Sequence, residues 1–514
     1  MSSLQVAKIM LAMSGFLYAL DSGAANATWS GAEDGDPTKA GNWSGTEGCG
    51  SLTDTGNRDN ATFRGAPSVT TIVPSQEWII GSFFFSDYNN QAAQWQIGSG
   101  NPDAAPIRLA GIGSGSLNFS HGDGITEFVV DLSGPFVVSS DYQFSCNSTE
   151  PSNALRLGRV SGKGNLQFKG SGSRGMIYGP ISDGEGGSIG ITKMHAGTWS
   201  IKGNNTFTGI VNVQYGTLIV AGDVGAAGTP GPLGANSSYT GGLGVRVGDP
   251  NASKLDFGAL LLGYNDNGTP VTFARETTSQ QNNKIDTCNQ LAHFGGANTN
   301  GVTKFTATVR SYRPTVLKCA EGGTVAFVGT FNPYDRAVTI GTEDFTGTVR
   351  FASSLNTSAG VTCAYGTLDM QSELKAATTV ESGAALTSGS ASNGKVTGAL
   401  TVNAGGILAG TEGGSLQIKG SLSLAEGAVL RFPAAEREEP LITVDSGISL
   451  AGIKVQIVDG ETRPQGRFPL LTATGGIADA DRLVADVLPR HCSVLVVGNT
   501  LYGRYNPGLT VVVR

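Results

Sequence analysis

The chain has 514 residues with a net charge of −7; 76 residues are glycine, and only 15% are charged where about 25% is usual. This length exceeds one compact domain, so several domains or a repeat array are expected. The scattered charges form no basic stripe, which argues against a nucleic-acid partner. Apolar runs such as Phe128-Val129-Val130 argue against disorder and favour many short strands joined by glycine- and asparagine-rich turns.

Residues 1–27 are typical of a secretory signal peptide. Lys8 is the only charge before the apolar run 9–20, and Ala25-Asn26-Ala27 has the form of a cleavage site. We therefore expect export with cleavage after Ala27; the alternative is a buried N-terminal helix. Because no other segment approaches the roughly 20 apolar residues of a membrane-spanning helix, none is expected in the mature chain.

Residues 28–190 are expected to form an N-terminal β-rich region. Trp29 and Trp43 stand in polar, glycine-rich surroundings. Large aromatic side chains in such a setting suggest anchors that cover the end of a β core. A stacked β array needs a cover of this kind, because its open end exposes apolar residues and unpaired strand edges.

Residues 191–432 are expected to form a β-solenoid. Gly383, Gly405 and Gly427 follow one another at intervals of 22 residues, and each opens a similar tetrapeptide that ends in leucine. A period of 20 to 30 residues with strand-like units is typical of a solenoid. We predict an all-β, right-handed parallel β-helix in which these glycines form one column and the leucines form another inside the core, namely Leu386, Leu408 and Leu430.

Two stretches interrupt this rhythm, residues 223–301 and 352–359, and both are expected to leave the coil as loops or hairpins. Residues 433–514 are expected to form a C-terminal β cap, with strands at 441–444, 493–497 and 509–513. The cap would cover the other open end of the coil.

Residues 191–222 resemble the autotransporter-associated β-strand repeat. A weaker copy occurs at residues 344–347 and 365–368. The residues that carry the main resemblance are Thr192, Lys193, Gly197, Thr198, Asn205, Thr206, Phe207, Thr208, Gly209, Gly216, Thr217 and Leu218.

This resemblance implies an exported β-helix of the passenger type, at or beyond the outer membrane of a Gram-negative-type bacterium. The sequence shows no C-terminal series of alternating ten-residue segments of the kind that a translocator barrel needs, so self-translocation is not expected. Anchorage and oligomeric state are left open.

No catalytic, cofactor-binding or metal-binding residue is assigned from the sequence, and no cofactor is expected. Aspartates beside glycine or proline are typical of turns, and a calcium loop starting at Asp34 would need a glutamate where Gly45 stands. Ser188 lies in a G-x-S-x-G match without the strand-then-helix context of a nucleophile elbow. The other residues considered, without ligand or catalytic spacing, are Glu33, Asp36, Asp123, Asp249, His121, His195, His293 and His491.

The six cysteines are widely spaced, and no C-x-x-C pair suggests a metal site. In an exported chain they could oxidise, and six cysteines allow 15 pairings that the sequence does not distinguish. Single buried thiols are the alternative. The residues concerned are Cys49, Cys146, Cys288, Cys319, Cys363 and Cys492.

We expect a structural or adhesive surface protein rather than an enzyme, a rigid repeat scaffold that presents polar faces. Its expected partner is a surface polysaccharide or another extracellular protein. The alternative is a β-helical polysaccharide lyase or glycoside hydrolase, which would need acids converging in a cleft. That alternative comes from the range of chemistry that β-helices support, which is an argument from fold alone.

Overall fold

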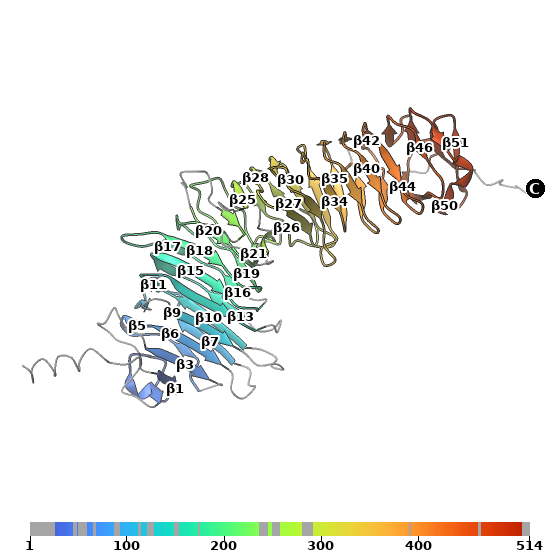
Figure 1. The fold of residues 1–514 in the computed structure, drawn as a ribbon. Coiled ribbons are helices and arrows are strands. Elements are labelled where there is room, and N and C mark those ends of the chain that lie inside the picture. Colours follow the sequence, from blue (N-terminus) through green and yellow to red (C-terminus); the bar gives the residue numbers. More distant parts are fainter. Residues whose placement is uncertain are drawn as a thin grey trace, which may run out of the picture. The chain divides into compact units, whose positions relative to one another are not determined.

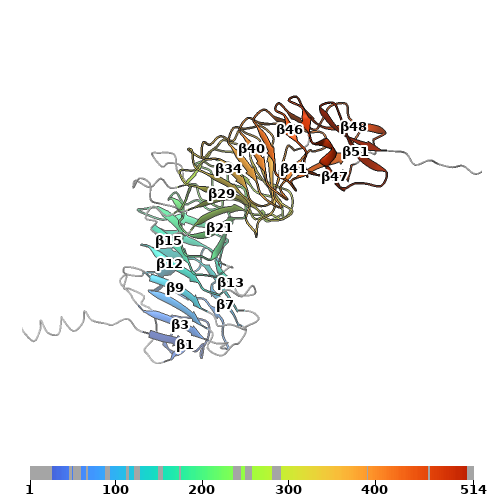
Figure 2. The same cartoon turned by 45° about the vertical axis from the view of Figure 1, so that its right-hand side comes forward.

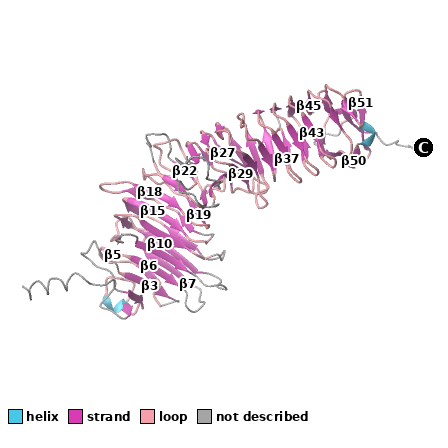
Figure 3. Cartoon of the chain, in the orientation of Figure 1, coloured by secondary structure: helices cyan, strands magenta, loops and turns pink. Residues whose placement is uncertain are grey.

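The computed structural model describes residues 26–44, 49, 59–64, 68–86, 93–110, 115–120, 128–148, 154–172, 175–235, 245–248, 257–279, 291–389, 392–460 and 464–505. Their regular elements are strands, apart from the short 3-10 helices η1 (Ala40–Asn42) and η2 (Ala480–Arg482) (Figure 3). Strands of successive coils pair in parallel, which confirms the predicted parallel β-helix (Figure 1). No helix among the described residues has the length and apolar character needed to cross a membrane.

The chain divides into two compact units, Met1–Gly209 and Ile210–Arg514. In the first unit, each coil sends its strands to three sheets. One sheet runs in the order β2 (Trp43–Ser44), β1 (Asn26–Trp29), β3 (Asn60–Arg64), β6 (Ser82–Ser86), β9 (Gly115–Ser120), β12 (Tyr142–Cys146), β15 (Gly164–Lys169), β18 (Ile189–Lys193). The second contains β4 (Thr71–Ile72), β7 (Ala93–Gly98), β10 (Phe128–Gly134), β13 (Ala154–Leu157), β16 (Gly175–Ile177), β19 (Thr198–Ile201). The third contains β17 (Ile181–Asp183), β14 (Val160–Gly162), β11 (Phe136–Val138), β8 (Ile107–Leu109), β5 (Trp78–Ile80).

In the second unit, one sheet contains β20 (Val211–Val213), β22 (Val245–Val247), β25 (Thr277–Ser279), β28 (Val309–Arg310), β31 (Phe331–Asn332). The next contains β21 (Gly216–Val220), β23 (Gly258–Leu262), β26 (Ala292–Gly296), β29 (Thr315–Cys319), β32 (Val338–Ile340), β34 (Val361–Cys363), β37 (Thr378–Val380), β40 (Leu400–Val402), β43 (Leu422–Leu424). A ten-stranded sheet contains β24 (Thr272–Phe273), β27 (Val302–Phe305), β30 (Thr324–Phe327), β33 (Thr348–Phe351), β35 (Thr367–Met370), β38 (Ala385–Thr387), β41 (Ile407–Ala409), β44 (Val429–Ala434), β47 (Lys454–Asp459), β50 (Val484–Val487). A seven-stranded sheet contains β36 (Glu373–Leu374), β39 (Asn393–Val396), β42 (Ser415–Ile418), β45 (Ile442–Val444), β48 (Gly466–Ala473), β52 (Thr500–Tyr505), β51 (Cys492–Val497), and a two-stranded one contains β46 (Ile448–Ser449) and β49 (Ile477–Ala478).

The predicted leucine column is confirmed. Leu386 pairs in register with Leu408, which pairs with Leu430, and all three side chains are fully buried. Alternation along each strand points these residues inward, and the coil above covers what one coil leaves open. In Figure 2 the labels β29, β34 and β40, three strands of one sheet, follow one another along this stack.

The predicted glycine column is also confirmed. The N–H of Gly383 donates to the carbonyl of Gly405, whose own N–H donates to the carbonyl of Gly427, both at 2.9 Å. All three have φ between +76° and +85°, a region that glycine adopts without steric cost. The period of 22 residues therefore reflects a left-handed corner repeated in each coil.

Antiparallel pairing occurs near both ends of the described fold, but parallel pairing continues past residue 432, where the cap was expected to begin, since β44 pairs with β47 and β47 with β50 in the parallel sense. At the N-terminal end β1 pairs with β2 in the antiparallel sense, and the rings of Trp29 and Trp43 meet edge to face at 5.1 Å over the core residue Phe63. At the C-terminal end β48, β52 and β51 pair in the antiparallel sense. A further coil would pair in parallel with the exposed edge of the last coil. The antiparallel strands at each end do not present an edge of that kind, so the stack ends there.

The expectation that residues 223–301 leave the coil holds only in part, because β23 and β26 pair in parallel within it. Gln280-Gln281-Asn282-Asn283 and the expected strand 509–513 lie outside the described residues. Residues 352–359 lie between β33 and β34, but Leu355 is fully buried and forms a parallel bridge with Leu374, which ties this stretch to the coil. Parallel coils occur on both sides of residue 191, and the compact units divide after Gly209.

Candidate functional site

The outer face of the ten-stranded sheet carries a hollow of about 570 Å³, here called the coil-face groove. It lies over β24, β27, β30, β33 and the end of β35, which are neighbours in that order in the sheet; Figure 1 labels β27, β30 and β35. The side chains that line it include Thr272, Lys304, Ala326, Val328, Arg350 and Gln371.

The floor of the coil-face groove is made rigid by an aromatic stack inside the coil. Phe327 stacks on Phe305 with ring centroids 5.0 Å apart and on Phe351 at 5.2 Å, with interplanar angles of 4° and 18°. Because successive side chains of a strand point to opposite faces, the residue before each phenylalanine points outward. Lys304 and Arg350 are such residues.

The hollow itself arises from a small residue between two large cations. Lys304, Ala326, Arg350 and Asp369 stand in register on four adjacent strands. Since the alanine carries only a methyl group, the aliphatic stems on either side rise above it. Ala326 is only 3% exposed although it lies on the outer face of the sheet.

Arg350 is fixed from one side and open on the other. Its Nε–H donates to Oδ2 of Asp369 at 2.7 Å. Asp369 is 2% exposed, and its other oxygen, Oδ1, is buried and has no hydrogen-bond partner among the described residues. Among the described residues, no hydrogen bond or ion pair is made by the Arg350 Nη groups or by the Lys304 ammonium. The groove therefore presents two cationic donors that the protein does not itself neutralise, apart from the buried carboxylate.

This arrangement can bind anions but is poorly suited to acid–base catalysis. Arginine binds carboxylates through parallel N–H donors, and lysine acts as a point charge. The carboxylate of Asp369 is covered and points at Arg350, so it has no access to a proton on a bound molecule. No further acid lines the described part of the groove.

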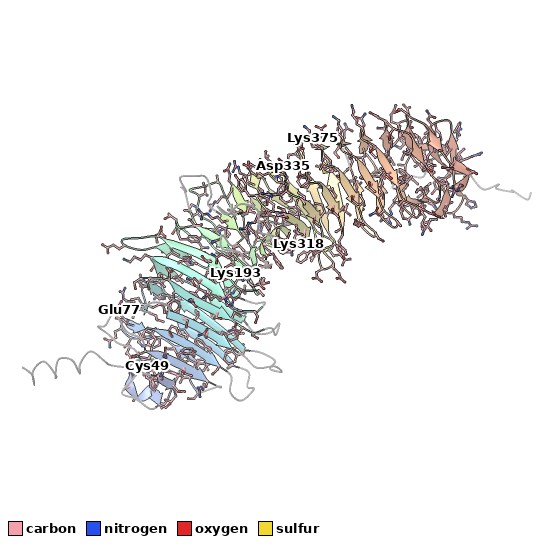
Figure 4. All side chains as sticks on the ribbon, in the orientation of Figure 1. Cys49, Glu77, Lys193, Lys318, Asp335 and Lys375 are labelled. Atoms are coloured by element: carbon pink, nitrogen blue, oxygen red, sulfur yellow. The ribbon has the colours of Figure 1, made fainter. Side chains whose placement is uncertain are left out.

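A second group of ionisable side chains is buried around Phe257. The His293 ring stacks on it at 4.2 Å, and the Lys318 ammonium lies 5.5 Å from its centroid and 4.2 Å from that of Phe345 (Figure 4 labels Lys318). Burial lowers the pKa of Lys318 to about 8, and burial together with the Lys318 charge lowers the pKa of His293 to about 3. Both side chains are less than 7% exposed, so this cluster offers no surface to a large ligand.

The structure uses Asp34 and Asp36 within the N-terminal cap. The amide oxygen of the buried Asn42 accepts from the backbone N–H groups of Glu33 and Asp34, and its amide donates to Asp34 Oδ1 at 2.9 Å. Asp36 Oδ1 accepts from the hydroxyl and N–H of Thr38. Hydrogen bonds, first of all from Lys39, lower the pKa of Asp34 to about 2. These carboxylates organise a turn.

The remaining residues considered from the sequence are not brought together. His195 and His491 lie at exposed turns with φ of +63° and +65°, whereas His293 is buried. Ser188 precedes β18, a strand and not a helix. Asp123, Asp249 and His121 lie outside the described residues. Within the described ranges no group of three or more His, Cys, Asp or Glu is placed to hold a metal ion.

The residues that carry the repeat resemblance have structural roles. The Lys193 ammonium donates to the carbonyls of Met194 and His195, both at 2.7 Å, and burial lowers its pKa to about 7 (Figure 4 labels Lys193). The Asn205 side chain is fully buried and accepts from the Ile181 N–H at 2.8 Å. Both side chains satisfy backbone groups at corners that strand pairing leaves open.

The cysteines of the described residues are mostly buried thiols. Cys49, Cys319 and Cys363 are free and buried, and burial raises the pKa of each to about 12, so they are unreactive at neutral pH. Cys492 is free and partly exposed. Cys146 is also buried, and Cys288 lies outside the described residues.

Comparison of the chain with protein-family models, with curated proteins and with solved structures finds no match. The resemblance to the autotransporter-associated repeat therefore remains a prediction from residues 191–222.

Sequence reasoning did not identify the coil-face groove, although a signal exists. Four tetrapeptides share one pattern, with an apolar second residue, a variable third residue and a large apolar fourth residue. They are Val302-Thr303-Lys304-Phe305, Thr324-Val325-Ala326-Phe327, Thr348-Val349-Arg350-Phe351 and Thr367-Leu368-Asp369-Met370, where threonine takes the second place in the first copy. Aligning them at the fourth residue would have placed the variable residues Lys, Ala, Arg and Asp in one outward row.

Proposed function

We propose that the chain is an exported structural or adhesive surface protein whose β-helix is a rigid scaffold for binding an extended partner at the coil-face groove. The observation that supports this proposal most directly is the pair of cationic side chains in the groove, Lys304 and Arg350. They lie above a stacked aromatic floor, and among the described residues Asp369 is the one counter-ion that pairs with them. A preformed row of donors on a rigid surface binds with little ordering cost. Export rests on the character of residues 1–27 and on the repeat resemblance.

The wider distribution of polar side chains supports a scaffold. Outward threonines repeat at matching positions of adjacent coils, as in the row Thr324, Thr348 and Thr367. Acidic side chains bind backbone groups of the coil. Asp183 accepts a hydrogen bond from the Ile189 N–H at 2.7 Å, and Asp141 accepts one from the Asn165 N–H at 2.9 Å. Such uses leave these carboxylates occupied with the coil itself.

One observation favours the enzymatic alternative, a polysaccharide lyase or hydrolase. Arg350 and Asp369 are a basic and an acidic residue that meet beside the groove, which is the minimum that such chemistry needs. The burial of Asp369 is the argument against it, because a general acid or base must come within hydrogen-bonding reach of the reacting group.

Export and surface attachment are tested by expressing the full chain in a Gram-negative host and fractionating the cells. We expect the protein outside the inner membrane, with an N-terminus at Thr28. The strand β1 begins at Asn26, so this cut would remove its first two residues, and sequencing of the N-terminus reports directly whether the cut falls there. An intact Met1 on cytosolic protein would contradict export.

A further inference from the structure

We infer that the coil-face groove is a binding site for an acidic polysaccharide, with Lys304 and Arg350 contacting two successive carboxylates along one polymer strand. This inference rests on the proposed function and specifies its ligand. It is carried by the unpaired cationic donors, by the hollow between them and by their spacing along the coil axis.

The spacing of the two cations selects among anionic polymers. Lys304 and Arg350 lie two strands apart in one row, with Ala326 between them. Adjacent strands are about 4.8 Å apart, so the two positions are separated by about 10 Å along the coil axis. An extended peptide places side chains of one face about 7 Å apart, and nucleic-acid phosphates recur about every 3.4 Å along the helix axis. A polysaccharide with an acid on every second sugar fits the longer interval better.

The chemistry of the lining also suits a sugar polymer. The Arg350 Nη groups can bind a carboxylate through parallel donors, while Lys304 supplies a second point charge. Gln371 and Thr272 offer an amide and a hydroxyl to sugar hydroxyls, and Val328, which is 46% exposed, offers an apolar surface to the C–H side of a ring. Ala326 leaves room for the sugar that bridges the two acids.

The arginine is held in place before any ligand arrives. Its Nε–H is bonded to the buried Asp369, and the aromatic stack below fixes the strand that carries it. The guanidinium plane is therefore already oriented, so binding costs little side-chain entropy. Among the described residues, none pairs with the Lys304 ammonium, so the arginine is the one of the two cations that the protein itself orients.

The test is calorimetric titration of the full chain with a hyaluronan oligosaccharide, whose carboxylates stand on every second sugar, and with its methyl-esterified form, a matched neutral probe. We expect binding of the acid form that weakens as salt is raised, and at least tenfold weaker binding of the ester. Lys304→Gln should weaken binding of the acid form about tenfold. The control Lys419→Gln, an exposed lysine that does not line the groove, should leave binding unchanged.

Ala326→Leu is the second variant, because it fills the hollow without changing charge; circular dichroism and the thermal midpoint establish that it folds. We expect it to weaken binding as well. If both groove variants bind the acid like the wild type, the groove is not the binding site in either the inference or the proposed function, while polymer binding by the scaffold stands. If the ester, polyglutamate or single-stranded DNA binds at least as tightly as the acid, the ligand class is wrong. If the wild type binds none of these probes, and no polymer in a polysaccharide panel, both the inference and the proposed function fail.

Discussion

Arg350 and Asp369 lie opposite each other on the adjacent strands β33 and β35, and the Arg350 Nε–H donates to Asp369 Oδ2 at 2.7 Å. The carboxylate is almost fully buried, whereas the guanidinium reaches the surface. Both side chains stand in the outward row of the sheet, one covered and one reaching the surface, so we expect the stability of the coil to depend on the same arginine as the proposed binding site.

Replacement of this arginine should therefore destabilise the protein as well as weaken ligand binding. Arg350→Gln leaves the Asp369 carboxylate buried without a cation, which we expect to lower the free energy of unfolding by about 2 kcal/mol. Urea denaturation measures this change. Lys304→Gln is the control, because this exposed lysine has no described partner and its replacement should change stability by less than about 0.5 kcal/mol. Equal stability of the two variants would show that the buried pair contributes nothing.

Leu408 tests the interior column directly. Leu408→Ala removes a fully buried side chain that stacks between Leu386 and Leu430, and we expect a loss of about 3 kcal/mol from the lost burial and the cavity. Ser423→Ala, on an exposed position of β43, should be nearly neutral. Chemical denaturation compares the two, and a loss below about 1 kcal/mol for Leu408→Ala would contradict a close-packed column.

Substitutions at two glycines distinguish the cost of a left-handed backbone conformation from the cost of steric overlap with neighbouring backbone atoms. Gly383 has φ +79°, and the space that a Cβ would occupy there is open, so Gly383→Ala should cost about 1 kcal/mol for the left-handed conformation. Gly383→Asn should cost less, because asparagine tolerates that region. A Cβ on Gly420 would lie 2.0 Å from the Gly398 carbonyl oxygen, so Gly420→Ala should be the most damaging of the three. Thermal midpoints rank the variants; the reverse order would refute the assigned roles.

The buried Lys318 predicts a pH dependence of stability. Its folded pKa of about 8 lies below the ordinary value of 10.5, so the unfolded chain binds more protons between these values and the stability of the wild type rises with pH across that window. Lys318→Met removes the cost of burying the charge. We expect it to be more stable than the wild type by about 3 kcal/mol below pH 8, with the difference lost by about pH 10.5.

Denaturant titrations at several pH values measure this difference, and Lys419→Met, at an exposed lysine, is the matched control. A variant less stable than the wild type at pH 7 would mean that the contacts of the ammonium with Phe257 and Phe345 outweigh the cost of its burial.

The regular coil could be predicted from the sequence because its signals are local. Each coil needs a glycine at its left-handed corner and a leucine at its inward position. Gly405 and its equivalents therefore show the repeat length, and Leu408 and its equivalents show which face of the strand points inward. The repeat-like residues Lys193 and Asn205 mark corners whose backbone groups they satisfy. These requirements concern residues within one coil, so a single sequence is enough to recognise them.

The coil-face groove could not be predicted in the same way, because it depends on register between coils of unequal length. From Lys304 to Ala326 the chain advances 22 residues, from there to Arg350 it advances 24, and from there to Asp369 it advances 19. A fixed period misaligns this row by several residues. The two cations come to lie on either side of an alanine when the strands are paired, or when the four tetrapeptides are aligned at their large apolar fourth residue, and a constant repeat length does not reveal this.

The coil-face groove is proposed to bind its polymer without cleaving it. To test this, reducing ends and unsaturated products are followed over time when the purified chain is incubated with the hyaluronan oligosaccharide under conditions where calorimetry shows binding. We expect saturable binding and no product above the level of a no-protein control. Product formation by the wild type that disappears in Asp369→Asn, while the variant stays folded, would contradict it and identify an enzyme.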